Sequence, residues 1–385
     1  MPTGPAASVE VLYGPVLQLT ESGIRMRFET QTEDPLPVYE GTDCPAAITP
    51  TTDTVERTYR WPDIDGQLGL DHPDAPGRYT QHEVLWTDLA PGEWVSWSIP
   101  TGPGADELLE GTFRAPPTKG QAFRVAFVGD TMSPMKETVL PLMATYEPDV
   151  FLHGGDIQYM SFPGDTWSAF FLAGRELMGN ALSTFCLGNH EYEGQDEETV
   201  LYDRFFGGQG NVADGTAEWH ATDYAGVRFV SLSSEAPMSD AADAQLVWLE
   251  AVLSEVDASA DLDQAVVFFH RPIYTLAHHE PRLAARAAID AVLDRHDVPL
   301  VLTGHNHSYE RFLVDGVTYV VDGGGGALLY DVDTNVEAYP EDAALRQAWD
   351  KSFGFTLLDV EGSSIRLSRM DENGELIDEA EIQAR

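Results

Sequence analysis

Basic residues are scarce in this sequence, and lysine is almost missing. The 385 residues include 22 lysines and arginines against 64 aspartates and glutamates, which gives a net charge of −42, and the only lysines are Lys119, Lys136 and Lys351. Such an acidic surface repels nucleic acid and anionic membranes unless salt screens it. We therefore expect neither as a partner. The balance is typical of a saline environment, although high-GC coding or a need for solubility would produce it too.

Long apolar runs are also missing. No segment approaches the roughly 18 consecutive apolar residues that a membrane-spanning helix needs, so we predict no membrane span. Residues 1–7 lack a basic start and an apolar stretch, so no signal peptide is visible, and a trimmed precursor would look the same. With 385 residues and 43% apolar side chains, the chain can form one large and one small domain, each with a core.

Cysteine occurs only twice, as Cys44 and Cys186. Cys186 lies in the strand-like run 183–187 and is expected to be a buried apolar side chain. A disulfide to Cys44 would have to join two regions that we assign to different domains. We therefore expect none.

The N-terminal third alternates apolar and polar residues and has no helical period. Residues 9–13, 23–29 and 93–99 show this alternation, and proline and glycine clusters, notably at 90–92 and 100–104, separate the runs. Several short strands with such turns predict a β-sandwich. It is expected to end near residue 117, in a proline-rich linker, and to serve as scaffold, lid or partner contact.

From residue 118 onward, apolar strands alternate with amphipathic helices. The expected strands are 123–128, 150–153, 184–187, 229–232, 265–269 and 299–302, and the clearest helices are 243–253 and 281–293. This order predicts an α/β domain with helices on both faces of the sheet. A terminal hairpin, 355–360 with 364–368, is expected to complete a sheet. Ligands of α/β sheets bind at the carboxyl ends of the strands.

Five polar turns follow successive strands at those ends. Their side chains are Asp130, Asp156 with Tyr159, Asn189 with His190, His270, and His305 with His307. One such Asp alone would be a helix cap or turn residue, and an isolated His-x-His pair would be two surface histidines. Five turns together predict a metal site, and oxygen donors beside imidazoles suit iron, manganese or zinc better than calcium. The donors exceed the needs of one ion, so we expect two ions about 3.5–4 Å apart that share a carboxylate.

The order of these motifs, GD, GDxxY, GNHE, VxxH and GHxH, resembles the metallophosphoesterase (calcineurin-like phosphoesterase) superfamily. Tyr159 of GDxxY points to its purple acid phosphatase branch, which is similar in having an N-terminal fibronectin-III-like domain. The resemblance implies an all-β sandwich over 1–117, followed by a catalytic α/β domain over 118–385 in which two packed β-sheets are flanked by helices. One departure is Met132, which stands where the family usually has the last glycine of GDxG and leaves the shape of that turn open.

The resemblance also implies the ligands of both ions. One ion would take Asp130, Asp156, Tyr159 and His307, and the other would take the bridging Asp156 with Asn189, His270 and His305. The implied metals are Fe(III) at the Tyr159 site and Fe, Zn or Mn at the second site. From the residue alone, Tyr159 could also pack against the sheet as an ordinary aromatic side chain, and both ions would then be divalent.

The implied activity is hydrolysis of phosphate monoesters by in-line attack of a hydroxide that the two cations generate. His190 and His279 are expected to bind the substrate, and these two together with His278 are the candidates for catalytic proton transfer. Glu191 is expected to orient an imidazole. Arg271 is a weaker candidate for phosphate binding, and a structural role is favoured.

Two alternatives stay open. A phosphodiesterase would use the same two-metal centre, and the sequence does not separate it from a monoesterase. A protein without activity would use the sandwich to bind a partner, with a degenerate metal domain, but the presence of every ligand type together with His190 argues against this. The expected partner is a small phosphate ester, and the resemblance implies an extracellular or periplasmic location. The oligomeric state is not indicated.

Overall fold

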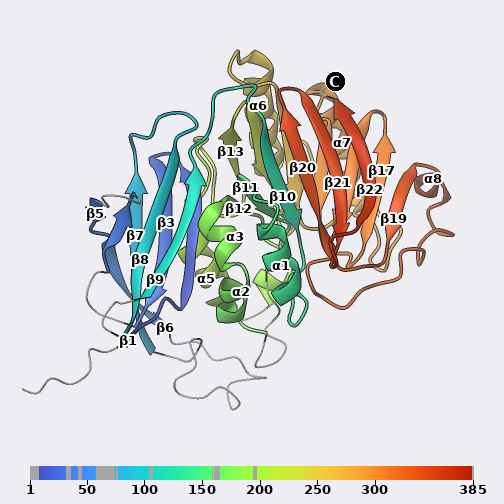
Figure 1. Cartoon of the computed structure of the whole chain (residues 1–385). Coiled ribbons are helices and arrows are strands. Elements are labelled where there is room, and N and C mark those ends of the chain that lie inside the picture. The colour runs from blue at the N-terminus through green and yellow to red at the C-terminus, as the bar shows by residue number, and fades with distance from the viewer. Residues whose placement is uncertain are drawn as a thin grey trace, which may run out of the picture.

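The computed structural model describes residues 8–31, 36–41, 46–57, 74, 77–103, 107–157, 159, 165–193 and 197–383. The N-terminal residues 1–7 and Cys44, for which we made predictions, lie outside these ranges. In Figure 1 the blue N-terminal strands form one side of the molecule and the orange and red C-terminal strands form the opposite side. Within the described residues, none of the helices combines the length and the apolar character needed to cross a bilayer.

The N-terminal part is all β, as predicted. Its strands are β1 (Ser8–Val9), β2 (Tyr13–Thr20), β3 (Gly23–Thr30), β4 (Val38–Glu40), β5 (Ala46–Ile48), β6 (Thr51–Arg57), β7 (Gly77–Trp86), β8 (Trp94–Pro103) and β9 (Glu107–Arg114). One sheet has the order β1-β8-β4-β5 with β9 on β8, and the other contains β2-β3-β7-β6. Side chains from both sheets, such as Met26, Phe28, Trp97 and Phe113, share one apolar cluster. The arrangement is a sandwich.

Two local expectations for the sandwich were wrong. Residues 9–13 form no single strand, because β1 ends at Val9 in one sheet and β2 begins at Tyr13 in the other. Strand β8 continues through the proline-rich stretch to Pro103 instead of ending before it. Pro100 lies between the parts of β8 that pair with β4 and with β1, so its missing N–H interrupts no ladder on that edge.

The rest of the chain contains two sheets that pack face to face between helices, which confirms the predicted fold class. The first sheet includes β10 (Phe123–Val128), β11 (Val150–His153), β12 (Leu182–Phe185), β20 (Gly354–Glu361), β21 (Ser364–Asp371) and β22 (Leu376–Gln383). The second consists of β13 (His220–Tyr224), β14 (Val227–Ser231), β15 (Gln264–Phe269), β16 (Leu300–Thr303), β17 (Tyr309–Val314), β18 (Val317–Asp322) and β19 (Arg346–Asp350). The predicted terminal hairpin is β20–β21, and β20 pairs with β10.

Central strands of the first sheet, such as β10, are buried on both faces, and alternate side chains point to opposite faces. Val125 and Phe127 of β10 pack in the cluster between the two sheets, whereas Ala126 and Val128 face the helices. The helices are α1 (Lys136–Ala144), α2 (Trp167–Ala173), α3 (Arg175–Asn180), α4 (His190–Glu193), α5 (Glu197–Phe206), α6 (Ala244–Ala258), α7 (Leu283–Arg295) and α8 (Pro340–Ala343). Helices α6 and α7, both predicted, cover the outer face of the second sheet.

One sheet runs through both halves of the chain. Strand β12 pairs in parallel with β2 at Leu182 and Leu17, so that β2-β3-β7-β6 extend the first sheet to ten strands. The Trp97 indole also donates a hydrogen bond to the carbonyl oxygen of Gly179 at the end of α3 (2.9 Å). The division of the chain near residue 117 stays a prediction, and these contacts show that the sandwich strands pack directly on the α/β part.

A buried ion pair joins the two sheets of the α/β part. Asp322 ends β18 and Arg369 lies on β21, and their side chains are both fully buried, 3.1 Å apart. The Asp322 carboxylate also accepts from the Thr356 hydroxyl (2.8 Å), and its backbone oxygen accepts from the Gly129 amide (3.0 Å). Neither charge reaches water, so each depends on the other for compensation.

We predict that Arg369→Met lowers the free energy of unfolding by about 3–5 kcal/mol, because it leaves the Asp322 carboxylate buried without its partner. Urea unfolding followed by tryptophan fluorescence measures the loss. The control is Arg366→Met on the same strand, whose side chain is 54% exposed and pairs with Glu379 at the surface. It should leave the midpoint unchanged, and equal midpoints for both variants would contradict the predicted role of the pair.

Candidate metal centre

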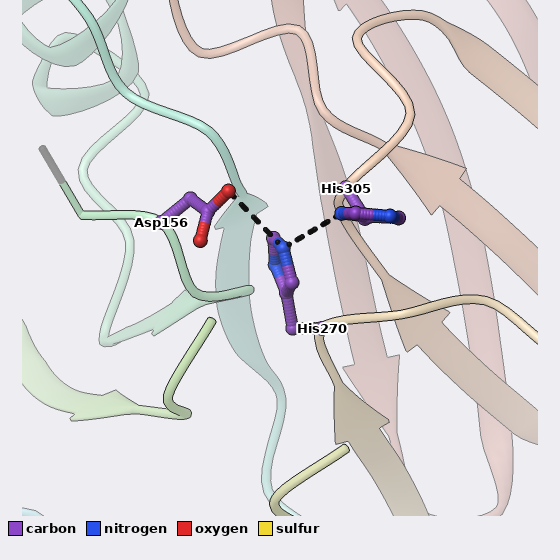
Figure 2. Close-up of side chains that lie close together, drawn as sticks. All are labelled: Asp156, His270 and His305. Carbon is purple, nitrogen blue, oxygen red and sulfur yellow. Dashed lines mark hydrogen bonds and ion pairs between the residues drawn. The ribbon is translucent and has the colours of Figure 1, made fainter. Parts of the chain in front are cut away.

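The predicted polar turns all lie at one edge, where the carboxyl ends of strands from both sheets meet. Strands β10, β11 and β12 are parallel neighbours, and so are β15 and β16. The turns are also linked to one another: the Asp130 amide donates to Gly155 O, and the Gly304 amide donates to His270 O, both at 3.0 Å. Figure 2 shows Asp156 from the first sheet pointing toward His270, and His270 toward His305, from the second.

Backbone conformation brings the ligand side chains close together. Asp130, Asp156 and His305 have φ angles of 62°, 51° and 68°, in the left-handed region that residues other than glycine seldom adopt. Two glycines make room for the carboxylates. A Cβ on Gly188 would lie 2.2 Å from an Asp156 oxygen, and one on Gly304 would lie 2.5 Å from an Asp130 oxygen. The GNHE and GHxH motifs therefore need glycine for steric reasons.

A first group of donor atoms surrounds the Tyr159 hydroxyl. Asp130 Oδ1 and His307 Nε2 lie 3.1 Å from it, and Asp156 Oδ2 lies 3.4 Å from it. His307 Nδ1 donates to the Leu328 carbonyl oxygen (2.9 Å), which leaves Nε2 with a lone pair that faces the carboxylates. Burial, followed by the charges of both aspartates, raises the pKa of Tyr159 well above its usual value. A nearby cation would have the opposite effect on this phenol.

A second group surrounds His270 Nε2. Asn189 Oδ1 and Asp156 Oδ2 each lie 3.2 Å away, and His305 Nδ1 lies 3.1 Å away. Figure 2 shows the contacts of His270 with Asp156 and with His305. His270 Nδ1 donates to the Gly154 carbonyl oxygen at 2.8 Å, so the ring is fixed with Nε2 toward the group. Burial disfavours the charged imidazole, but the Asp156 carboxylate outweighs this and raises the pKa of His270 to about 9.

Asp156 belongs to both groups. Its Oδ2 contacts Tyr159 and His270, while its Oδ1 accepts from the His190 amide at 2.9 Å. Oxygen and imidazole donor atoms from several buried side chains converge here, an arrangement that needs protons or cations between them. The donors therefore fit two cations that share this carboxylate. The structure brings together all the predicted ligand residues: Asp130, Asp156, Tyr159, Asn189, His270, His305 and His307.

Glu191 has a different partner from the imidazole that we expected. Its buried carboxylate accepts from the backbone N–H groups of Gly188 (2.7 Å), Asp156 (3.0 Å) and Ile157 (2.8 Å). Burial, with a contribution from Asp156, raises the pKa of Glu191 to about 8. Glu191 thus ties the GDxxY turn to the GNHE turn and holds the shared carboxylate indirectly.

Met132, the departure from the GDxG pattern, leaves Asp130 in the site. The backbone oxygen of Asp130 accepts from the Ala327 amide at 3.1 Å, and its Oδ2 accepts from the His305 amide at 2.7 Å. The Met132 carbonyl oxygen accepts from the Lys136 amide at 3.0 Å, so this turn is hydrogen-bonded to the first residue of α1. The turn therefore needs no glycine at its last position.

The three histidines predicted for substrate binding or proton transfer lie at the rim of the centre. The ring of His190, whose side chain is one-third exposed, lies 4.1 Å from the Tyr159 ring. The half-buried His279 stacks on His305 with ring centroids 4.2 Å apart, and the exposed His278 lies 4.9 Å from His279. Burial and the neighbouring His278 lower the pKa of His279 to about 4.

Sequence reasoning missed Tyr330. Its ring stacks on His307 with centroids 4.1 Å apart and planes 13° apart, and it also packs against His278 at 4.6 Å. Its amide donates to the His307 carbonyl oxygen (2.9 Å). Tyr330 stands in an irregular segment after a glycine run, where no periodicity or motif marks it.

Known proteins resemble this chain in sequence and in fold. Residues 123–309 match the family described as calcineurin-like phosphoesterase. Purple acid phosphatase 21 of Arabidopsis thaliana is 30% identical over 213 residues, which are 53% of this chain and 48% of that protein. The chain spans about half the length of the curated relatives that it matches first.

Solved structures agree on the fold. The purple acid phosphatase PPD1 from seeds of yellow lupin (Lupinus luteus) superposes with a TM-score of 0.75 at 19% identity, over 95% of this chain and 73% of the lupin chain. The structure of PhoD superposes with a TM-score of 0.60 at 11% identity, over 100% of this chain and 90% of that chain. Taken with the sequence matches, residues 123–309 form a calcineurin-like phosphoesterase domain, and the purple acid phosphatases are homologues of this chain.

Proposed function

We propose that this chain hydrolyses phosphate monoesters at a centre of two cations. The observation that carries the proposal is the pair of donor groups that meet at Asp156, one around the Tyr159 hydroxyl and one around His270 Nε2. The purple acid phosphatase homologues support the same reaction class.

The two donor groups divide the ligands between the ions. Asp130, Asp156, Tyr159 and His307 would hold one cation, and Asp156, Asn189, His270 and His305 would hold the other. A phenolate oxygen favours Fe(III) at the first position, and the oxygen and imidazole donors of the second suit Fe, Zn or Mn. When bound, two such cations lower the pKa of a coordinated water and neutralise charge on the phosphoryl oxygens.

The residues at the rim would then handle the substrate. His190, beside Tyr159, and His279, stacked on His305, would donate hydrogen bonds to phosphoryl oxygens. The oxygen of water forms a bond to phosphorus as the ester P–O bond opposite to it breaks, and the water gives up one proton to the solvent. The leaving oxygen takes a proton from His279 or His278 and departs as an alcohol. A neighbouring phosphate dianion favours the protonated imidazole, so it would raise the pKa of His279 from its low value in the free protein.

Two other functions remain to be tested against this one. A phosphodiesterase would use the same ligands, and a partner-binding protein without activity would use the sandwich and leave the metal domain degenerate. An extracellular or periplasmic location stays a prediction from the relatives. The partners that we propose are small phosphate esters.

Turnover of two chromogenic substrates separates these functions. We expect the metal-loaded chain to hydrolyse p-nitrophenyl phosphate faster than bis-p-nitrophenyl phosphate, to lose activity on dialysis against a chelator, and to regain it when Fe, Zn or Mn is returned. Release of p-nitrophenol is the measurement. Faster diester turnover would favour the phosphodiesterase, and no turnover of either ester with two bound metals would favour the protein without activity.

Substitutions of the proposed metal ligands and of the rim histidine His279 should have different effects on bound metal and on activity. Asn189→Ala and His270→Ala are expected to lower kcat/KM by about 10²- to 10³-fold or more and to reduce bound metal, because each removes a donor from the second group. His279→Ala should keep both metals and lose activity mainly with alkyl phosphates, whose leaving groups need a proton more than p-nitrophenolate does. Metal analysis and kinetics on both substrate types test this. Equal activity of all three variants would exclude the site.

A visible absorption band tests the iron assignment. If Tyr159 binds Fe(III) as a phenolate, the iron-loaded protein should be coloured, and Tyr159→Phe should remove the band while the other donors of the first group stay in place. Absorption spectra of the two iron-loaded proteins provide the measurement. A colourless, iron-free wild type with full activity would refute the ferric assignment and leave the phosphoesterase proposal intact.

A further inference from the structure

Arg271 lies at the same edge as the metal centre, held by a specific partner. It follows His270 at the end of β15, and its Nε donates to Glu235 Oε1 at 2.6 Å. Glu235 comes from the turn after β14, the parallel neighbour of β15, and the Arg271 amide donates to the Ser234 hydroxyl in that turn at 3.1 Å. The Arg271 side chain is 28% exposed, so solutes can reach it.

The second contact of this guanidinium depends on the state of His305. Arg271 Nη1 lies 3.1 Å from His305 Nε2, while His305 Nδ1 faces His270 on the opposite side of the ring. Figure 2 shows this ring with one edge toward His270 and the other edge turned away. A guanidinium has only donors, so Nε2 accepts from it only while the proton of the neutral ring is on Nδ1.

A cation at the second donor group changes this contact. It needs the lone pair of His305 Nδ1, and the proton of the neutral imidazole then lies on Nε2. Nε2 can no longer accept from Arg271, whereas the ion pair with Glu235 is unaffected. The guanidinium is thus left anchored through Nε with free N–H groups beside the centre, at the side of the rim where His279 stacks on His305.

We propose that Arg271, anchored by Glu235, binds a phosphoryl oxygen of the substrate and favours monoesters over diesters. This inference rests on the proposed function and adds a residue to the substrate site. A monoester near neutral pH is largely a dianion, and a diester is a monoanion. A guanidinium in contact with the phosphoryl oxygens attracts a dianion about twice as strongly as a monoanion, because the Coulomb energy is proportional to the product of the charges, and the Glu235 carboxylate offsets part of this attraction for both esters.

The ion pair with Glu235 fixes the position of Arg271 and also neutralises a carboxylate near the rim. In a chain with a net charge of −42, an unpaired Glu235 would repel the substrate. The planar guanidinium can hold a carboxylate through one edge and offer N–H groups from another, whereas a lysine has a single nitrogen for both. Arginine, and not lysine, can therefore contact Glu235 and a phosphoryl oxygen through separate nitrogens at the same time.

Calorimetric titration of the metal-loaded full chain with inorganic phosphate tests the inference without turnover. We expect R271Q to raise the dissociation constant of phosphate about tenfold or more, because a charge-assisted contact is lost. The kcat/KM ratio of p-nitrophenyl phosphate to bis-p-nitrophenyl phosphate should also fall. The matched control is R295Q, which removes one positive charge from the end of α7, where Arg295 pairs with Glu250. It should bind phosphate as the wild type does.

The outcomes separate this inference from the proposed function. If the wild type is active and R271Q keeps both metals, wild-type phosphate affinity in R271Q overturns the role of Arg271 alone. An equal loss in R295Q also overturns it, since the effect would then be long-range charge. If R271Q fails to fold or to hold metal, R271K replaces it, and wild-type phosphate affinity in R271K overturns the inference. A metal-loaded wild type that turns over no ester refutes the proposed function itself.

Discussion

The carboxylate of Asp156 imposes the main constraint on this structure, because it is buried and has to serve two groups of donor atoms at once. Its Oδ2 lies 3.4 Å from the Tyr159 hydroxyl and 3.2 Å from His270 Nε2. Such proximity requires a left-handed backbone at Asp156 and no side chain at Gly188. It also requires a fixed turn, which the Glu191 carboxylate provides through three backbone N–H groups. The left-handed backbone at Asp156, which is unfavourable alone, is stabilised by these surrounding contacts.

The packing of the two sheets against each other keeps the donor atoms around Asp156 together. Asp156 belongs to one sheet and His270 to the other, and each donor group takes residues from both sheets, so a small slide between the sheets would disrupt both groups. The buried pair of Asp322 and Arg369 crosses the same interface, and the Asp322 backbone holds the Gly129 amide next to the first ligand. Pairing of β12 with β2 extends one of these sheets into the sandwich. The sandwich therefore adds area to the layer that carries Asp130, Asp156 and Asn189.

The sequence predicts what is local and repeated. Strands such as 123–128 and the turns that follow them are short-range patterns, so the fold class and the polar turns that meet at one edge could be predicted without coordinates, and the family resemblance then proposed the ligands. Contacts between distant segments left no such pattern. The pairing of Leu17 with Leu182, the stacking of Tyr330 on His307 and the backbone role of Glu191 all depend on how remote turns pack. The ion pair of Arg271 with Glu235 left no pattern for the same reason, since the two residues lie 36 positions apart.

The large negative charge of the chain would repel an anionic substrate, so the residues around the metal centre would have to offset this repulsion. A phosphate ester that approaches 64 acidic residues is repelled over a distance of about 8–10 Å at moderate ionic strength, and salt reduces this repulsion. Contacts at about 3 Å are screened far less. Near the centre the structure places histidines and one arginine whose acidic neighbour is already paired. If the proposed function is right, the positive field that an anionic substrate requires would be built locally, from the two cations and a few rim side chains, while the rest of the surface stays acidic.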